Sequence, residues 1–188
     1  MRAGRPGEVD AATFRGTSRH WSTGVALITA RHGEEVFAKT VSSLCTLSLE
    51  PPLVSVAVDA RSPLVAAVRG SGRYAVSVLA SHQEPIARRF AARGAGRALG
   101  LFTGAPMRTG TTGTPLLEDC LAWFDCRLHS VLPGGDHALL VGRVTAAGSS
   151  TSTGSGSPTR PTTRPSNRRW TNSPGCSTSS TNPSTRNC

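Results

Sequence analysis

Five hydroxyl side chains stand close together in the first third of the sequence, within the run KTVSSLCTLSLEPPLVSVAV at residues 39–58. They belong to Thr40, Ser42, Ser43, Thr46 and Ser48. Small hydroxyl side chains supply hydrogen-bond donors and leave the neighbouring backbone N–H groups approachable. Such a surface could hold a polar, planar ligand that carries a phosphate. Runs rich in Ser and Thr are also common in plain loops, and on residue types alone the plain loop is the stronger interpretation.

The elements around this run are predicted to be mostly strands. Pro51 and Pro52 restrict the backbone, so we expect residues 50–53 to form an extended corner that feeds a buried strand at 53–58. Apolar or alternating patterns predict further strands at residues 25–30, 36–39, 73–80, 121–132 and 138–145. The sequence PGGDH joins the last two as a long hairpin. Short helices are expected after Asp10, after Ser62–Pro63 and at residues 82–92.

This pattern predicts a mainly β fold, an antiparallel barrel of about six strands with a few short helices. The helices are too few and too irregularly placed for repeated βαβ units. Residues 93–114 are rich in Gly, Arg and Thr and are expected to form a long loop. The sequence has no GxGxxG after a strand and no GxxxxGK[ST], so neither a Rossmann nor a P-loop nucleotide site is supported.

Composition divides the chain into a loose N-terminus at residues 1–9, a body at 10–147 and a tail at 148–188. The tail contains no Leu, Ile, Val, Met, Phe or Tyr, and Trp170 is its only large apolar residue. It cannot bury enough apolar surface to offset its ordering entropy, so we expect it to be disordered. So abrupt a change in composition is what a shifted reading frame would produce.

The charge and the cysteine content of the chain limit the kinds of ligand, partner and metal ion that we expect it to bind. The formal net charge is +10, and the five arginines of the tail, which has no acidic residue, carry half of it. The mildly basic body suits anionic small ligands, and the tail arginines lack interleaved aromatic residues, so we expect no nucleic-acid partner. The five cysteines form no CxxC pair and have no His at zinc-ligand spacing, so no metal site is expected. We expect Cys45 to be a small buried residue.

No segment has the length of a signal peptide's apolar core or of a membrane-spanning helix. We therefore expect a cytoplasmic protein with reduced thiols and no membrane contact.

Four segments, in the same order, resemble the flavin reductase-like family of FMN-binding split-barrel proteins. They are FRGTSRHWSTGVALITA, KTVSSLCTLSLEPPLVSVAVD, SGRYAVSVLASHQEPIARRFA and CLAWFDCRLHSVLPGGDHALLVGRV. The SLEPPL corner and the GDH hairpin are the most telling. The resemblance implies a six-stranded antiparallel split β-barrel and a homodimer with flavin near the subunit interface. It also implies reduction of FMN or FAD by NADH or NADPH, with the reduced flavin diffusing to a partner flavin-dependent monooxygenase.

The resemblance also implies site residues, carried over position by position. The flavin ring and ribityl chain are expected along Thr40, Val41, Ser42, Ser43 and Leu44. The phosphate end is expected near Asp59, Ala60, Arg61 and Ser62, and near Phe90 and Arg93, with Arg89 as the alternative to Arg93. A solvated charge at a helix end is an equally good interpretation of Arg93. His137 matches the position that approaches the nicotinamide. No catalytic acid or base is expected, since hydride transfer needs close, stacked rings more than proton transfer.

Two departures from the family pattern leave a second function open. Pro63 stands where many relatives carry Arg, so the phosphate or adenine contact at that end is expected either to be lost or to be replaced by Arg61. After the GDH hairpin, the final segment with Tyr near Arg that relatives carry is missing. The alternative is therefore a split-barrel protein that binds flavin but has little or no reductase activity.

Overall fold

The computed structural model describes residues 9–91 and 105–149 of the 188-residue chain. The chain divides into two units, Met1–Ser152 and Thr153–Cys188. Residues 1–8 of the predicted N-terminal segment, Arg93, and the tail from residue 150 lie outside the described residues.

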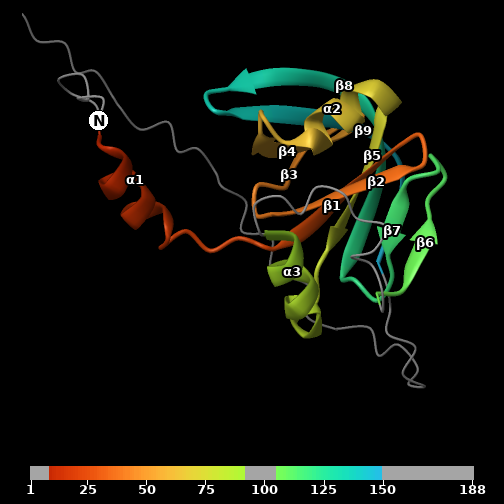
Figure 1. Cartoon of the computed structure of the whole chain (residues 1–188), viewed down its shortest axis with the longest axis horizontal. Coiled ribbons are helices and arrows are strands. Elements are labelled where there is room, and N and C mark those ends of the chain that lie inside the picture. The colour runs from red at the N-terminus through yellow and green to blue at the C-terminus, as the bar shows by residue number, and fades with distance from the viewer. Residues whose placement is uncertain (1–8, 92–104, 150–188) are drawn as a thin grey trace, which may run out of the picture. The chain divides into compact units, whose positions relative to one another are not determined.

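Seven strands form one antiparallel sheet in the order β2-β1-β5-β8-β9-β4-β3 (Figure 1). Their bounds are β1 Ala26–His32, β2 Glu35–Val41, β3 Cys45–Leu49, β4 Pro52–Asp59, β5 Arg73–Val78, β8 Ala122–Gly134 and β9 His137–Gly148. A second sheet pairs β6 (Met107–Thr109) with β7 (Pro115–Leu117). The helices are α1 (Ala11–Ser18), α2 (Pro63–Ser71) and α3 (Glu84–Ala91), and a 3-10 turn, η1 (Ser81–Gln83), precedes α3.

The prediction of a mainly β, antiparallel fold is confirmed, but the prediction of a six-stranded barrel is wrong in two respects. The main sheet has seven strands, and it is not closed, because β2 and β3 stand at its two ends. The strand that the sequence missed is β3, which pairs only with β4 and has a bulge between Thr46 and Ser48. Its residues are mostly exposed, so it lacks the buried face that makes a strand recognisable in a sequence. The predicted loop at 93–114 also contains β6.

Local sequence signals explain how several elements begin and turn. Asp10 caps α1 by accepting the Ala12 and Thr13 amides, and Pro63 occupies the first turn of α2. Gly33 and Gly135 turn the β1–β2 and β8–β9 hairpins with positive φ angles of 59° and 69°. Helix α2 ends at a left-handed Gly72.

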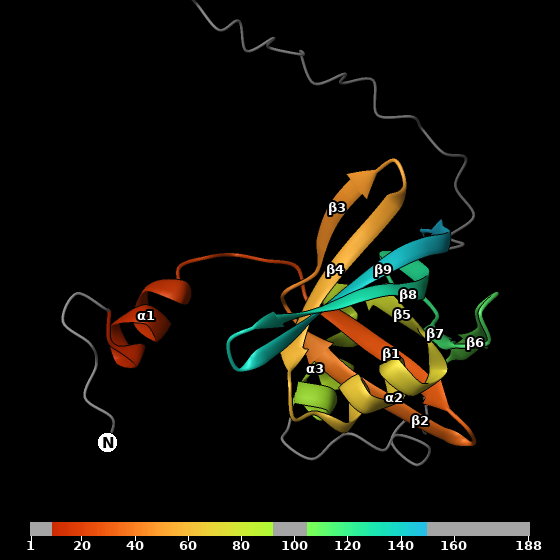
Figure 2. The ribbon, with the colours of Figure 1, turned by 90° about the horizontal axis from the view of Figure 1, so that it is seen from above.

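Two apolar clusters cover the two faces of β1 and β2. Ile28 and Phe37 belong to the cluster that α2 joins, whereas their neighbours Leu27 and Val36 belong to the cluster that contains Phe90 of α3. Successive side chains of a strand point to opposite faces, so α2 and α3 pack on opposite faces of this strand pair. Figure 2 shows both helices beside β1 and β2. Among the described residues, no helix is long and apolar enough to cross a membrane.

Candidate functional site

A pocket of about 600 Å³ opens between the C-terminal ends of β2 and β4. One wall consists of residues 39–43, and the other of residues 57–59 at the end of β4. His137, the first residue of β9, and Phe14 of α1 complete the lining. A volume of this size is within the usual range for sites that bind small organic ligands.

Ser43 joins the two walls. Its Oγ donates a hydrogen bond to the Ala57 carbonyl at 2.8 Å and accepts one from the Ala57 amide at 3.0 Å. One hydroxyl thus replaces a pair of backbone hydrogen bonds just before β3 and β4 begin to pair, at Cys45 and Ser55. The Ser43 proton is committed to this bridge, so Ser43 shapes the pocket but does not donate to a ligand.

The other residues of the segment 40–44, which were predicted to lie along the flavin, differ in the contacts they make. Thr40 Oγ1 donates to the Ala87 carbonyl of α3 at 2.8 Å, which fixes the β2 wall to that helix. Val41 is buried in the α2 cluster, and Leu44 packs against it. Ser42 is exposed, and its hydroxyl makes no hydrogen bond to another residue within 9–91 or 105–149. Among the described residues of this wall, Ser42 and Lys39 therefore have the side chains that can still donate a hydrogen bond to a ligand.

The segment 59–62 is held at the rim of the pocket by backbone contacts. The Ala60 amide donates to the Asp136 carbonyl at 3.0 Å, and the Ser62 amide donates to the Asp59 carbonyl at 2.8 Å. The Asp59 carboxylate accepts the Arg61 amide at 2.9 Å, and this bond, with the Arg61 side chain, lowers the pKa of Asp59 below its ordinary value. Asp59 lines the pocket, whereas Ala60, Arg61 and Ser62 follow it at the edge.

His137 stands opposite Asp59 in the β4–β9 register. Its Nδ1 lies 2.7 Å from Asp136 Oδ1, and this contact lowers the pKa of Asp136. Because one ring nitrogen faces a carboxylate, Asp136 fixes the orientation of the half-exposed imidazole. In the described part of the chain, no group of three or more His, Cys, Asp and Glu side chains could hold a metal ion.

The pocket therefore brings together six of the predicted site residues, namely Thr40, Val41, Ser42, Ser43, Asp59 and His137. Phe90 is placed elsewhere, because its side chain is 1% exposed within the α3 cluster. Cys45 is exposed, so the expectation of a buried thiol is wrong. Sequence reasoning missed Phe14, Lys39, Ala57 and Val58 as lining residues. The one available signal was that Lys39 is the only lysine in the chain.

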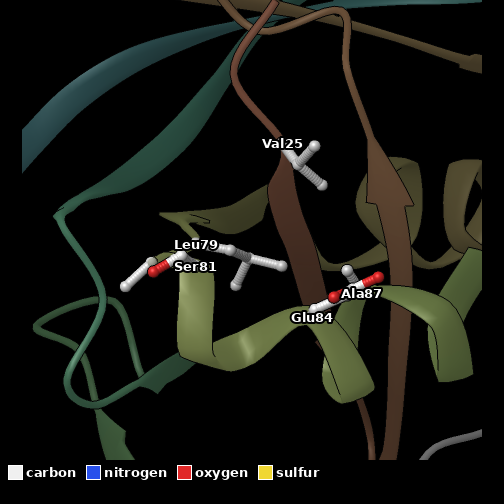
Figure 3. A pocket seen from close by; sticks show the side chains of 6 residues that line it. Val25, Leu79, Ser81, Glu84 and Ala87 are labelled. Carbon is white, nitrogen blue, oxygen red and sulfur yellow. The ribbon is translucent and has the colours of Figure 1, made fainter.

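A second, smaller pocket of about 330 Å³ lies against α3 (Figure 3). It is lined by Val25, Leu79, Ala80, Ser81, Glu84 and Ala87, none of which was a predicted site residue. Its only charged lining side chain, Glu84, is bonded to Arg88 at 2.6 Å. This pocket has fewer polar groups to orient a ligand than the pocket at β2 and β4.

Comparison with known proteins shows which family the chain belongs to. Residues 18–159 match the model of the flavin reductase like domain. The chain belongs to this family. The matched range contains every residue of the pocket except Phe14.

Individual relatives are similar over most of their length. The chain is 36% identical over 131 residues to the reductase component of 4-hydroxyphenylacetate 3-monooxygenase from Thermus thermophilus, covering 70% of this chain and 80% of that protein. It is 37% identical over 149 residues to the NADH-dependent FMN reductase AsuE2 of Streptomyces nodosus subsp. asukaensis, covering 76% of each. Among solved structures, BorF, the flavin reductase component of a bacterial two-component tryptophan halogenase, superposes with a TM-score of 0.70 at 34% identity, covering 76% of this chain and 89% of BorF.

Proposed function

We propose that this chain is an NAD(P)H-dependent flavin reductase that supplies reduced flavin to a partner monooxygenase. The family and the relatives support this function. The observation that carries the proposal at the level of residues is the pocket, which gathers a hydroxyl and amide wall from β2, an acidic rim from β4 and His137 from β9.

The pocket is proposed to hold FMN or FAD, with NADH or NADPH as co-substrate. Its volume fits a tricyclic ring, and backbone N–H groups with Ser42 can hydrogen-bond the polar edge of that ring. Bound flavin would supply the hydride acceptor, and the chain would supply placement and electrostatics. The ring would lie along Thr40–Leu44, and the phosphate would approach Asp59–Ser62, with Arg93 as a further basic residue for it.

His137 is proposed to face the nicotinamide. Asp136 holds one ring nitrogen, which leaves the other side of the imidazole for a ligand at the pocket. A fixed imidazole would help to keep the nicotinamide stacked on the flavin ring, which hydride transfer requires.

A homodimer in the cytoplasm is part of the proposal. Two leucines on the outer strand β3 support an interface there, since Leu47 is 52% and Leu49 is 89% exposed. The three described cysteines are free thiols, as in proteins of reducing compartments. The reduced flavin would pass to the monooxygenase by diffusion.

The test is NADH or NADPH oxidation by the purified chain with FMN or FAD. We expect turnover well above that of free flavin, and we expect His137→Ala to lower kcat/KM for the pyridine nucleotide about tenfold while leaving the Kd for FMN within about twofold. Flavin binding without oxidation of either pyridine nucleotide would instead support the flavin-binding alternative. No binding and no turnover would reject both functions.

A further inference from the structure

Lys39 is the only lysine among the 21 basic residues of the chain, and it lines the pocket together with Asp59 and His137. It is half-buried near the C-terminal end of β2. No motif in the sequence assigns it a function.

Lys39 precedes Ser43 by four residues on the same wall of the pocket, near the end of β2. Ser43 bonds to Ala57, and Cys45 pairs with Ser55. The two segments therefore run antiparallel, and a lower residue number in the first corresponds to a higher residue number in the second. If the two walls stayed paired beyond Ser43 and Ala57, the same count would set Val41 opposite Asp59 and Lys39 opposite Arg61. However, β2 pairs with β1 rather than β4, so the two walls separate and leave the pocket between them.

Among the described residues that line the pocket, Lys39 is the cation without a counter-ion in the protein. Asp59 is bonded to Arg61, with Nε 3.4 Å from Oδ1, and Asp136 contacts His137. Within the part of the chain that the structure describes, the Lys39 ammonium makes no ion pair. An ammonium group that lines a pocket without a protein counter-ion is well suited to an anionic group of a ligand.

We propose that the Lys39 ammonium binds the 5′-phosphate of the flavin. This proposal rests on the function proposed above, and it adds a contact that the family pattern did not supply. The Arg61 guanidinium forms an ion pair with Asp59, and its side chain is 89% exposed, so Arg61 is less available than Lys39 to bind the phosphate. Lys39 would therefore make the pocket prefer phosphorylated flavin over the phosphate-free molecule.

Affinity for FMN and riboflavin tests the proposal, because the two ligands differ only in the phosphate. For Lys39→Met we expect the Kd for FMN to rise about tenfold and the Kd for riboflavin to stay within about twofold of the native value. Lys39→Arg keeps the charge and should recover most of the FMN affinity. Arg69→Met removes an exposed charge from α2, away from the pocket, and should change neither Kd.

The single lysine allows a second measurement on the unaltered chain. Acetylation of Lys39 by an amine-selective reagent, followed by peptide mass analysis, should slow about fivefold or more with saturating FMN and stay unchanged with riboflavin. The N-terminal amine serves as the internal reference.

Three outcomes would overturn the proposal. An equal loss of affinity for both flavins in Lys39→Met would place the ammonium against the ring rather than the phosphate. An unchanged Kd for FMN with a raised KM for NADH would assign the contact to a phosphate of the pyridine nucleotide. Unchanged values throughout would leave Lys39 without a ligand contact. These binding measurements are independent of turnover, so a failure of the reductase proposal would show separately, as absent NAD(P)H oxidation by the native chain.

Discussion

Individual hydroxyl groups in the pocket have different tasks, which their residue types do not reveal. Ser42 and Ser43 are neighbours of the same type, and the sequence predicted both as flavin contacts. In the structure, Ser43 bridges the amide and carbonyl of Ala57, whereas the Ser42 side chain is exposed at the pocket. The distinction depends on how β2 meets β4, two strands that do not pair, so local sequence could not predict it.

These two serines give a paired prediction. Ser43→Ala removes the bridge and leaves the Ala57 amide and carbonyl without that partner, so we expect the free energy of unfolding to fall by about 1–2 kcal/mol. Ser42→Ala removes only a surface hydroxyl, so we expect unchanged stability and a rise of a few fold in the Kd for FMN. Urea unfolding and FMN titration of both variants measure the two effects. Equal losses of stability would contradict the division of tasks.

At the scale of elements, sequence patterns predicted the longer strands that carry buried residues, and missed the exposed strand β3 and the two three-residue strands β6 and β7. The Val-rich run of β4 was recognisable because it is a short apolar run with buried valines at 54, 56 and 58, and β8 was recognisable from the alternation of apolar and polar residues over residues 124–129. Strand β3 is mostly exposed, and β6 and β7 are three residues each, so their sequences carry little periodicity. The helix starts at Asp10 and Pro63 were predicted correctly because capping is a local interaction.

The rim segment 59–62 depends on an ionised carboxylate, which gives a prediction on pH. The pKa of Asp59 is lowered first by the Arg61 amide and then by the Arg61 side chain, so ionisation favours the folded rim. This contribution is present above the ordinary value of 3.8 and is lost as the pH falls through the lowered pKa. NMR titration of the Asp59 carboxylate should give a midpoint below 3.8.

Arg61→Ala separates the two causes of this shift. It removes the guanidinium but keeps the amide of residue 61, so the midpoint should rise and still lie below 3.8. A native midpoint at or above 3.8 would show that the carboxylate does not hold the rim.

At the scale of the whole molecule, the pocket lies between the ends of β2 and β4, two strands that do not pair with each other. Because β2 and β3 stand at the two ends of the sheet, the end of β2 separates from β4, and the pocket forms at that separation. The residues that line it come from positions 14, 39–43, 57–59 and 137, far apart in the chain. Resemblance to a family pointed to positions 40–43, 59 and 137, whereas composition and periodicity could not bring the lining residues together.

The most direct test of the account is the location of bound flavin on the whole chain. Titration of isotopically labelled protein with FMN, followed by amide chemical shifts, should perturb residues 39–44, 57–62 and 137 and leave the pocket at Val25, Leu79 and Ala87 unchanged. Perturbations confined to that second pocket, with the ends of β2 and β4 unaffected, would contradict the assignment of the flavin site.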